Sequence, residues 1–271
     1  MVDKSEKFSW LVRVGYFSRA ILYFVLGLVA LTSAAKIAEG TNGIFRAIND
    51  FPGGNVILWI MVVGLFAYAL FRFCSPLFDI ENQGSDSKGW AKRIGHAGSG
   101  IAHLVLAYSA YKFAGRDSAG TEPGAGGGGA QEAASGVLSM EFGGAILGIL
   151  GITFFVAAIF QAKKGISGEF MNRISAAAPD ATRWLGGAGY VARGVVYTVI
   201  GWSLFKAGFM SGGAEQIKTL GDAVASLAGE GFVFTLTAIG LMLFGLFSLV
   251  LARYRIIPDL DSSAGVPKFR A

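Results

Sequence analysis

Residues 184–205 read WLGGAGYVARGVVYTVIGWSLF, and this stretch decides the fold. It is long and apolar enough to cross a membrane as a helix, because a hydrocarbon core of about 30 Å needs about twenty apolar residues. Similar stretches recur along the chain, and the spans we expect are 10–35, 55–74, 93–114, 142–162, 187–209 and 231–254. In agreement, 53% of the residues are hydrophobic and 15% are charged. The sequence predicts an all-α, polytopic membrane protein with six transmembrane helices.

The same pattern occurs in two earlier segments of the chain. When Trp10, Trp90 and Trp184 are set in register, the copies align without gaps at offsets of 80 and 94 residues. The aligned positions that follow the tryptophans are Gly15, Gly95 and Gly189, then Tyr16, His96 and Tyr190, then Arg19, Ser99 and Arg193, and then Tyr23, His103 and Tyr197. A fixed period of this length indicates an internal structural repeat.

Each copy continues with a short amphipathic piece and a second apolar helix. The amphipathic pieces are 43–50, 131–140 and 217–227. A glycine followed four residues later by an aromatic marks each second helix, as Gly64 and Tyr68, Gly151 and Phe155, and Gly240 and Phe244. Because each unit has two spans, all copies have the same orientation. We therefore expect a single membrane domain, 1–271, with parallel repeats 10–79, 90–164 and 184–255 in a pseudo-threefold bundle.

The net charge of the chain is +5, and its basic residues are distributed as membrane topology predicts. If the N-terminus is cytoplasmic, the inner segments contain fifteen of the basic residues and the outer loops contain six. The inner residues are Lys4, Lys7, Arg13, Arg72, Lys88, Lys92, Arg93, Lys163, Lys164, Arg173, Arg183, Arg253, Arg255, Lys268 and Arg270, and the outer ones are Lys36, Arg46, Lys112, Arg116, Lys206 and Lys218. The positive-inside rule therefore predicts that both termini are cytoplasmic. It also explains the basic balance without a nucleic-acid partner.

The repeated motif resembles a known family. GYVARGVVYTVIGW at 189–202, GYFSRAILYFVLGL at 15–28 and GHAGSGIAHLVLAY at 95–108 are similar to a bacterial membrane family, domain-of-unknown-function family 1206. That family has three tandem two-helix modules, and the resemblance extends from about Trp10 to Tyr254. The middle copy departs from the pattern at His96, Ser99 and His103. The resemblance implies the fold and a location in the bacterial inner membrane, and it implies no activity.

One stripe of the fifth span carries the candidate functional residues. Tyr190, Arg193 and Tyr197 lie on one helical face with Gly194 and Gly201, because their spacing follows the helical period. The first span repeats this face as Tyr16, Arg19 and Tyr23, and the third as His96, Ser99 and His103. Two interpretations remain open. The stripe packs helices through small residues and hydroxyl groups, or it faces a ligand.

Enzyme and metal chemistry have little support in the sequence. His96 and His103 would lie about 10 Å apart along a helix, which is too far for them to share one metal ion. We expect them to form hydrogen bonds in the bundle, with a metal or proton-relay role as the alternative. No Asp or Glu lies in any predicted span, and no Ser-His-Asp set or zinc motif occurs. We expect no catalytic residues, no metal and no cofactor.

Arg19 and Arg193 each lie nine residues beyond a tryptophan, roughly 13 Å deeper along the helix axis. Their partners must be backbone carbonyls, tyrosine hydroxyls, water or an external anion. Either the arginines extend to inner-leaflet phosphates, or both turn inward and hold one anionic group. The function we expect is non-enzymatic binding or passage of a small anionic ligand or lipid headgroup. The alternative is an accessory or scaffold subunit with another membrane protein as its partner.

Overall fold

Six long helices dominate the part of the chain that the computed structural model describes, which is residues 4–32, 41–77, 86–114, 128–210, 213–258 and 269–270. They are α1 (Lys4–Thr32), α4 (Gly54–Leu77), α5 (Ser87–Ala114), α7 (Gly143–Ser167), α8 (Thr182–Phe209) and α10 (Phe232–Tyr254). Each corresponds to one predicted span, so the predicted all-α fold is confirmed. Residues 33–35, at the end of the first predicted span, lie outside the described residues.

Shorter elements connect the long helices. The amphipathic pieces expected in the three repeats are α3 (Thr41–Asn49), α6 (Gly128–Leu138) and α9 (Leu220–Ala225). Three 3-10 helices accompany them, η1 (Glu169–Arg173), η2 (Ala214–Gln216) and η3 (Ala228–Glu230), and the strands β1 (Ile257–Pro258) and β2 (Phe269–Arg270) form a small antiparallel pair. Thr219 begins α9 with a capping box, because its side chain and that of Asp222 satisfy each other's backbone N–H groups.

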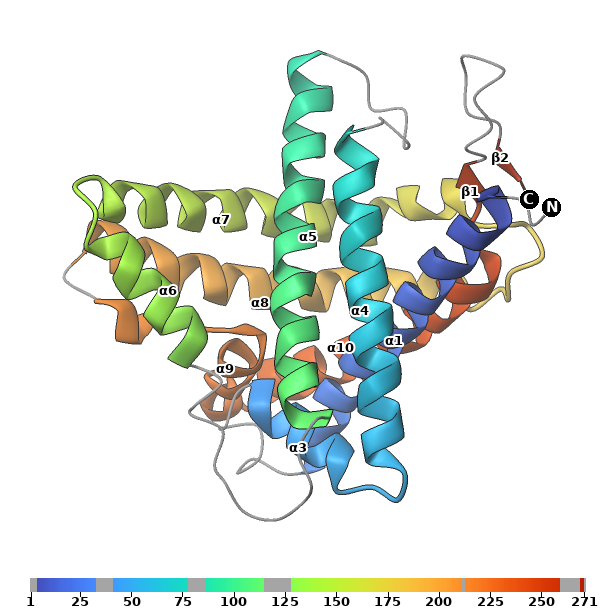
Figure 1. Cartoon of the computed structure of the whole chain (residues 1–271), viewed down its shortest axis with the longest axis horizontal. Helices are drawn as coiled ribbons and strands as arrows, with labels where there is room; N and C mark the ends of the chain where they lie inside the picture. Colours follow the sequence, from blue (N-terminus) through green and yellow to red (C-terminus); the bar gives the residue numbers. More distant parts are fainter. Residues whose placement is uncertain are drawn as a thin grey trace.

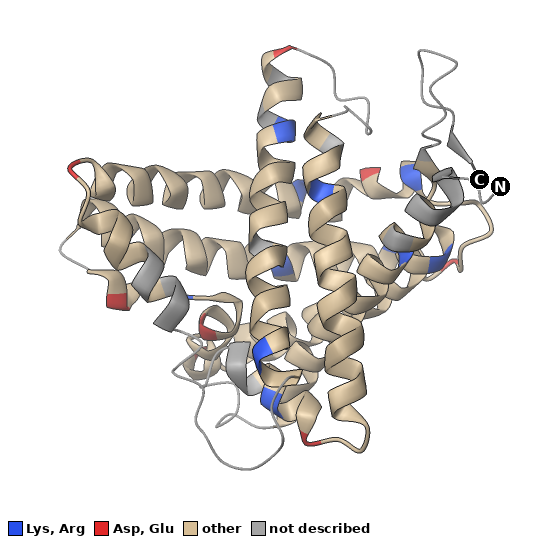
Figure 2. Cartoon of the chain, in the orientation of Figure 1, with Lys and Arg blue, Asp and Glu red and all other residues tan. Residues whose placement is uncertain are grey.

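Among the described residues, four helical segments are long and apolar enough to cross a membrane: Val12–Thr32, Gly54–Cys74, Gly143–Ser167 and Phe232–Tyr254. Helices α5 and α8 carry more charged and small residues, which lowers their apolar character. Long stretches of α7 and α10 have no charged residue (Figure 2). These features define a multi-pass membrane protein. That α5 and α8 also cross the membrane remains a prediction.

The long helices pack as three pairs, α4 with α5, α1 with α10, and α7 with α8 (Figure 1). Helix α1 also packs on α4, and α10 also packs on α8, so the helices are joined in the order α5–α4–α1–α10–α8–α7. The α4–α5 pair and the α7–α8 pair run in different directions in Figure 1. The predicted threefold arrangement about one membrane normal is not shown by this geometry and remains a prediction.

Glycines set the contact between the two helices of a repeat. A Cβ atom on Gly15 of α1 would lie 2.6 Å from the Cβ of Tyr68 on α4. A Cβ atom on Gly189 of α8 would also lie 2.6 Å from the Cβ of Phe244 on α10. These positions are equivalent in the repeat register, so the first and third repeats pack in the same way. At the equivalent Gly95 of α5, an added Cβ would meet no described atom within 4 Å.

This difference generates a matched pair of stability predictions. Gly189→Ala should destabilise the protein by about 1–3 kcal/mol, because its methyl group overpacks the α8–α10 contact. Gly95→Ala should leave the stability unchanged or raise it by up to about 1 kcal/mol, because alanine favours helix and meets no neighbour. Unfolding by sodium dodecyl sulfate from mild detergent measures both variants. Equal destabilisation of the two would contradict the described packing of the repeats.

Candidate functional site

Arg19 lies in the protein interior, with 5% of its surface exposed. Its Nε donates to Ser248 Oγ at 3.1 Å, and its Nη1 donates to the Tyr68 hydroxyl at 3.0 Å. The guanidinium carbon lies 4.7 Å from the ring centre of Tyr16 and 5.0 Å from that of Phe244. Its Nη2 is buried and has no hydrogen-bond partner among the described residues. The side chain therefore points into the helix cluster, and one donor remains available there.

Arg193 approaches the same place from α8. Its Nη2 donates to the Tyr197 hydroxyl one turn along the helix. When the Gln161 amide of α7 is turned to satisfy its hydrogen bonds, its oxygen accepts from Arg193 Nη1 and Nη2, each at 3.2 Å. Arg193 Nε is buried, and no described residue accepts its hydrogen. Arg193 thus also keeps one unused donor in the interior.

The ring of Phe244 joins the two arginines into one site, which we call the arginine pair (Arg19 and Arg193). The guanidinium carbons lie 5.0 and 4.6 Å from its ring centre, within the range of cation–π attraction. Tyr23 and Tyr190 pack edge-on against the same ring, with centre-to-centre distances of 4.9 and 5.4 Å. Phe244 is 0% exposed, so the attraction acts away from water.

The hydroxyl group of Tyr68 holds a third guanidinium group, that of Arg72, beside the arginine pair. Its hydroxyl oxygen accepts from Arg72 Nε at 3.0 Å and Nη2 at 2.6 Å, in addition to the bond from Arg19. The His103 ring lies 4.6 Å from the Tyr68 ring, and His103 Nδ1 is 2.7 Å from the backbone oxygen of Ser99. A carbonyl oxygen only accepts, so Nδ1 carries the hydrogen of this bond.

The structure gathers most of the predicted stripe residues. Tyr16, Arg19, Tyr23, His103 and Tyr190 are buried, and His96, Ser99, Arg193 and Tyr197 are half-buried. Each long helix contributes a side chain to the cluster, and the contributors are Arg19 from α1, Tyr68 from α4, His103 from α5, Gln161 from α7, Arg193 from α8 and Phe244 from α10. A site built from all the long helices exists only in the folded protein.

Several members of the cluster were not predicted as site residues. They are Tyr68, Arg72, Gln161, Phe244 and Ser248, and all lie on the second helices of the repeats. Tyr68 and Phe244 had been identified only as markers of those helices. Their shared position, four residues after a glycine, was a usable signal. Gln161 had no such signal, apart from being a polar residue near the end of an apolar span.

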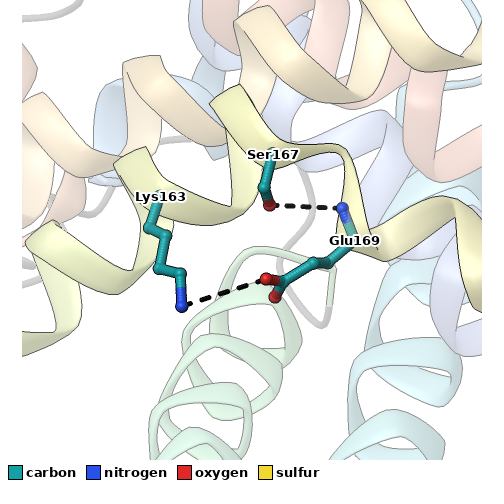
Figure 3. Close-up of polar contacts among 3 residues, drawn as sticks. All are labelled: Lys163, Ser167 and Glu169. Carbon is teal, nitrogen blue, oxygen red and sulfur yellow. Dashed lines mark hydrogen bonds and ion pairs between the residues drawn. The ribbon is translucent and has the colours of Figure 1, made fainter.

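No carboxylate balances the arginine pair among the described residues. An ion pair among the described residues joins Lys163 Nζ and Glu169 Oε1, which are 3.9 Å apart (Figure 3). It lies beyond the apolar stretch of α7. Both of its side chains are more than half exposed, so it contributes little stability. Ser167 Oγ accepts from the backbone N–H of Glu169 at 3.3 Å and fixes the chain there.

The described cavities lie away from the arginine pair. One, of about 170 Å³, is lined by residues of α1 and the α3 region, including Val25, Thr32 and Ala47. Another, of about 330 Å³, is an open apolar hollow that includes Val14, Trp59 and Val63. In the described residues, no group of three His, Cys, Asp or Glu side chains is placed to bind a metal ion.

The apolar helices and the buried aromatic cluster define a helical, multi-pass membrane protein. The chain belongs to the family described as Domain of Unknown Function (DUF1206), whose model matches residues 14–78, 94–168 and 188–255. The starts of these segments are separated by the same offsets as the three tryptophans. The uncharacterized protein YxxB of Bacillus subtilis (strain 168) is 27% identical over 93% of this chain and 94% of its own length. No solved structure matches the chain.

The hydrogen bonds at Tyr68 lead to a stability prediction. Tyr68→Phe should destabilise the protein by about 1–3 kcal/mol, because donors of Arg19 and Arg72 lose their acceptor in a buried place. Tyr23→Phe is the matched control, since Tyr23 lies in the same cluster and none of the described hydrogen bonds involves its hydroxyl. Its effect should be no more than about 0.5 kcal/mol. Unfolding in detergent compares the two, and an equal effect would contradict the role of the Tyr68 hydroxyl.

Proposed function

We propose that this protein binds an oxyanion, the phosphate of a lipid headgroup or a small free anion, at the arginine pair and catalyses no reaction. The observation that carries the proposal is the pair of unused buried donors, Arg19 Nη2 and Arg193 Nε. A buried guanidinium with an unsatisfied N–H costs free energy, and an oxyanion would supply both the acceptor and the opposite charge.

The class of ligand follows from the donors. Guanidinium groups have planar N–H forks that match the spacing of phosphate and carboxylate oxygens. Their charge is not neutralised by any carboxylate of the predicted spans. We further propose that the protein lies in the bacterial inner membrane with both termini cytoplasmic. This orientation would place the site toward the inner leaflet, where anionic lipid headgroups attract basic residues.

A second candidate is an accessory or scaffold subunit that contacts another membrane protein. The feature that favours it is the fully buried ring of Phe244, which both guanidinium groups contact. In this case the aromatic rings alone would accommodate the arginines, and the cluster would only hold the helices together. The two candidates differ in whether the folded protein binds an anion at the arginine pair.

Binding of phosphatidylglycerol tests the proposal. Wild-type protein in phosphatidylcholine nanodiscs should bind added phosphatidylglycerol, and Arg19→Gln and Arg193→Gln should each weaken this binding at least about tenfold, equivalent to about 1.4 kcal/mol. Arg183→Gln is the control, because Arg183 lies exposed at the start of the same helix as Arg193. Inorganic phosphate as competitor distinguishes the sources of the anion. Unchanged binding in the Arg19→Gln, Arg193→Gln double variant would favour the scaffold candidate.

The proposed orientation is tested by thiol labelling in intact cells. In a Cys74→Ser background, a cysteine at the exposed Ser139, between α6 and α7, should react with an impermeant maleimide. A cysteine at the exposed Ala177, between η1 and α8, should react only after the cells are lysed. The charge distribution sets this expectation, because basic residues concentrate on the side of Ala177. The opposite labelling pattern would exclude cytoplasmic termini.

A further inference from the structure

The two arginines of the pair differ in how firmly their hydrogen-bond partners are held. Arg19 donates its Nε hydrogen to Ser248 Oγ, and that hydroxyl is itself fixed because it donates to the backbone oxygen of Phe244 at 2.8 Å. Arg193 is paired with the longer side chain of Gln161, and both residues are half-buried. Since a glutamine side chain has several rotamers, the partner of Arg193 can turn away while the helices stay in place.

Gln161 accepts hydrogen bonds from Arg193 in the manner of an oxyanion. In the amide orientation that satisfies its hydrogen bonds, the Gln161 oxygen lies 3.2 Å from both Nη1 and Nη2 and occupies the outer fork of the guanidinium group. A carboxylate or phosphate would place charged oxygens on such a fork at about 2.7–2.9 Å. The amide offers one neutral oxygen at a longer distance, so its bonds are weaker. Arg193 is thus held by an acceptor that an oxyanion can replace.

The repeated fold does not itself require an amide at this position. In the repeat register the residues equivalent to Gln161 are Cys74 in α4 and Val250 in α10, ten residues after the marker glycine of each second helix. The backbones of α7 and α8 are close here, because a Cβ atom on Gly194 would touch Gln161 Cβ at 3.8 Å. An amide in an apolar span costs free energy unless it is hydrogen-bonded. Its placement beside Arg193 therefore indicates a role at the site.

We propose that the Gln161 amide is a built-in substitute for the ligand, which occupies the Arg193 fork while no anion is bound and is displaced when an oxyanion binds. Turning the Gln161 side chain outward frees N–H groups of Nη1 and Nη2 for the anion, in addition to the unused Nε. The Tyr197 hydroxyl keeps its bond from Nη2 and holds the guanidinium group in position. The displacement favours charged ligands over neutral ones, because a charged acceptor binds the fork more strongly than the amide does. It rests on the proposed anion site.

Opposite substitutions of Gln161 test the displacement in phosphatidylcholine nanodiscs. Gln161→Ala removes the competing amide, so phosphatidylglycerol should bind at least about threefold more tightly than to the wild type. Gln161→Glu places a carboxylate in the Arg193 fork, so binding should weaken at least about tenfold. A residue that only holds α7 against α8 would change the affinity in the same direction in both variants, or in neither. Either of these results overturns the displacement.

Two further variants separate the fork contact from general effects of charge and folding. Ile166→Glu adds a carboxylate to the same helix at a side chain that is 75% exposed, and solvent screening should keep its effect on affinity below about twofold. Gln161→Asn keeps an amide and withdraws its oxygen from the fork, so it should bind as tightly as Gln161→Ala, and it serves as the test if the glutamate variant does not fold. Equal weakening by Ile166→Glu and Gln161→Glu, or wild-type affinity in Gln161→Asn, overturns the displacement.

The same measurements keep the displacement distinct from the proposed anion site. Binding that is lost in Arg193→Gln and unchanged in all Gln161 variants overturns the displacement and leaves the anion site in place. A wild-type protein that binds neither phosphatidylglycerol nor inorganic phosphate overturns both. Inorganic phosphate titrated alone distinguishes the two sources of the oxyanion. Tighter binding of phosphate to Gln161→Ala than to the wild type shows that the free anion suffices, and binding of phosphatidylglycerol alone assigns the site to the lipid headgroup.

Discussion

The constraint on which this structure depends is the burial of two guanidinium groups in spans that contain no carboxylate. By insertion scales each arginine costs about 2.5–3.5 kcal/mol at the membrane centre. A desolvated cation–π contact stabilises a buried arginine by about 2 kcal/mol, and the hydrogen bonds to Tyr68, Tyr197 and Ser248 add further stabilisation. The insertion cost and the stabilisation by these contacts are of similar size, so the arginines are tolerated only if the surrounding rings and hydroxyl groups are in place. Those groups come from different helices, which links the helix arrangement to the site.

Glycine provides the geometry that this arrangement needs. Tyr68 and Phe244 reach the arginines because their backbones lie against Gly15 and Gly189, where any side chain would clash. Within membranes small residues allow such close approach, and packing rather than hydrophobicity then drives association. The glycine that closes the helix pair therefore also positions the aromatic ring that covers the arginine. Fold and site use the same few positions of the repeat.

The sequence predicted the long helices and the residues of the first stripe because both depend on local periodicity. The tryptophan register located α1, α5 and α8 and placed Arg19 and Arg193 on one face with their tyrosines. The second helices gave less information, because the spacing of glycine and aromatic residue marked Tyr68 and Phe244 without showing that they contact the arginines. Helices α7 and α10 are apolar on nearly all sides, so periodicity cannot show which face of such a helix points inward. This is why Gln161 and Ser248 were not predicted as members of the site.

The sequence divergence of the second repeat accompanies a different packing of its second helix. In the first and third repeats the arginine contacts the aromatic ring of its own second helix, at 5.4 Å for Arg19 on Tyr68 and 4.6 Å for Arg193 on Phe244. This contact joins the two helices of the repeat across the glycine interface. Ser99 replaces the arginine in the second repeat, so Phe155 has no guanidinium to cover. The repeat that lacks the arginine is also the one whose helices are apart. Its second helix packs elsewhere, because Gly151 lies against Gly201 and Phe205 of α8 and the Phe155 ring centre is 6.5 Å from that of Phe205. The glycine and aromatic positions that join the two helices of the first and third repeats thus join α7 to the neighbouring repeat in the second.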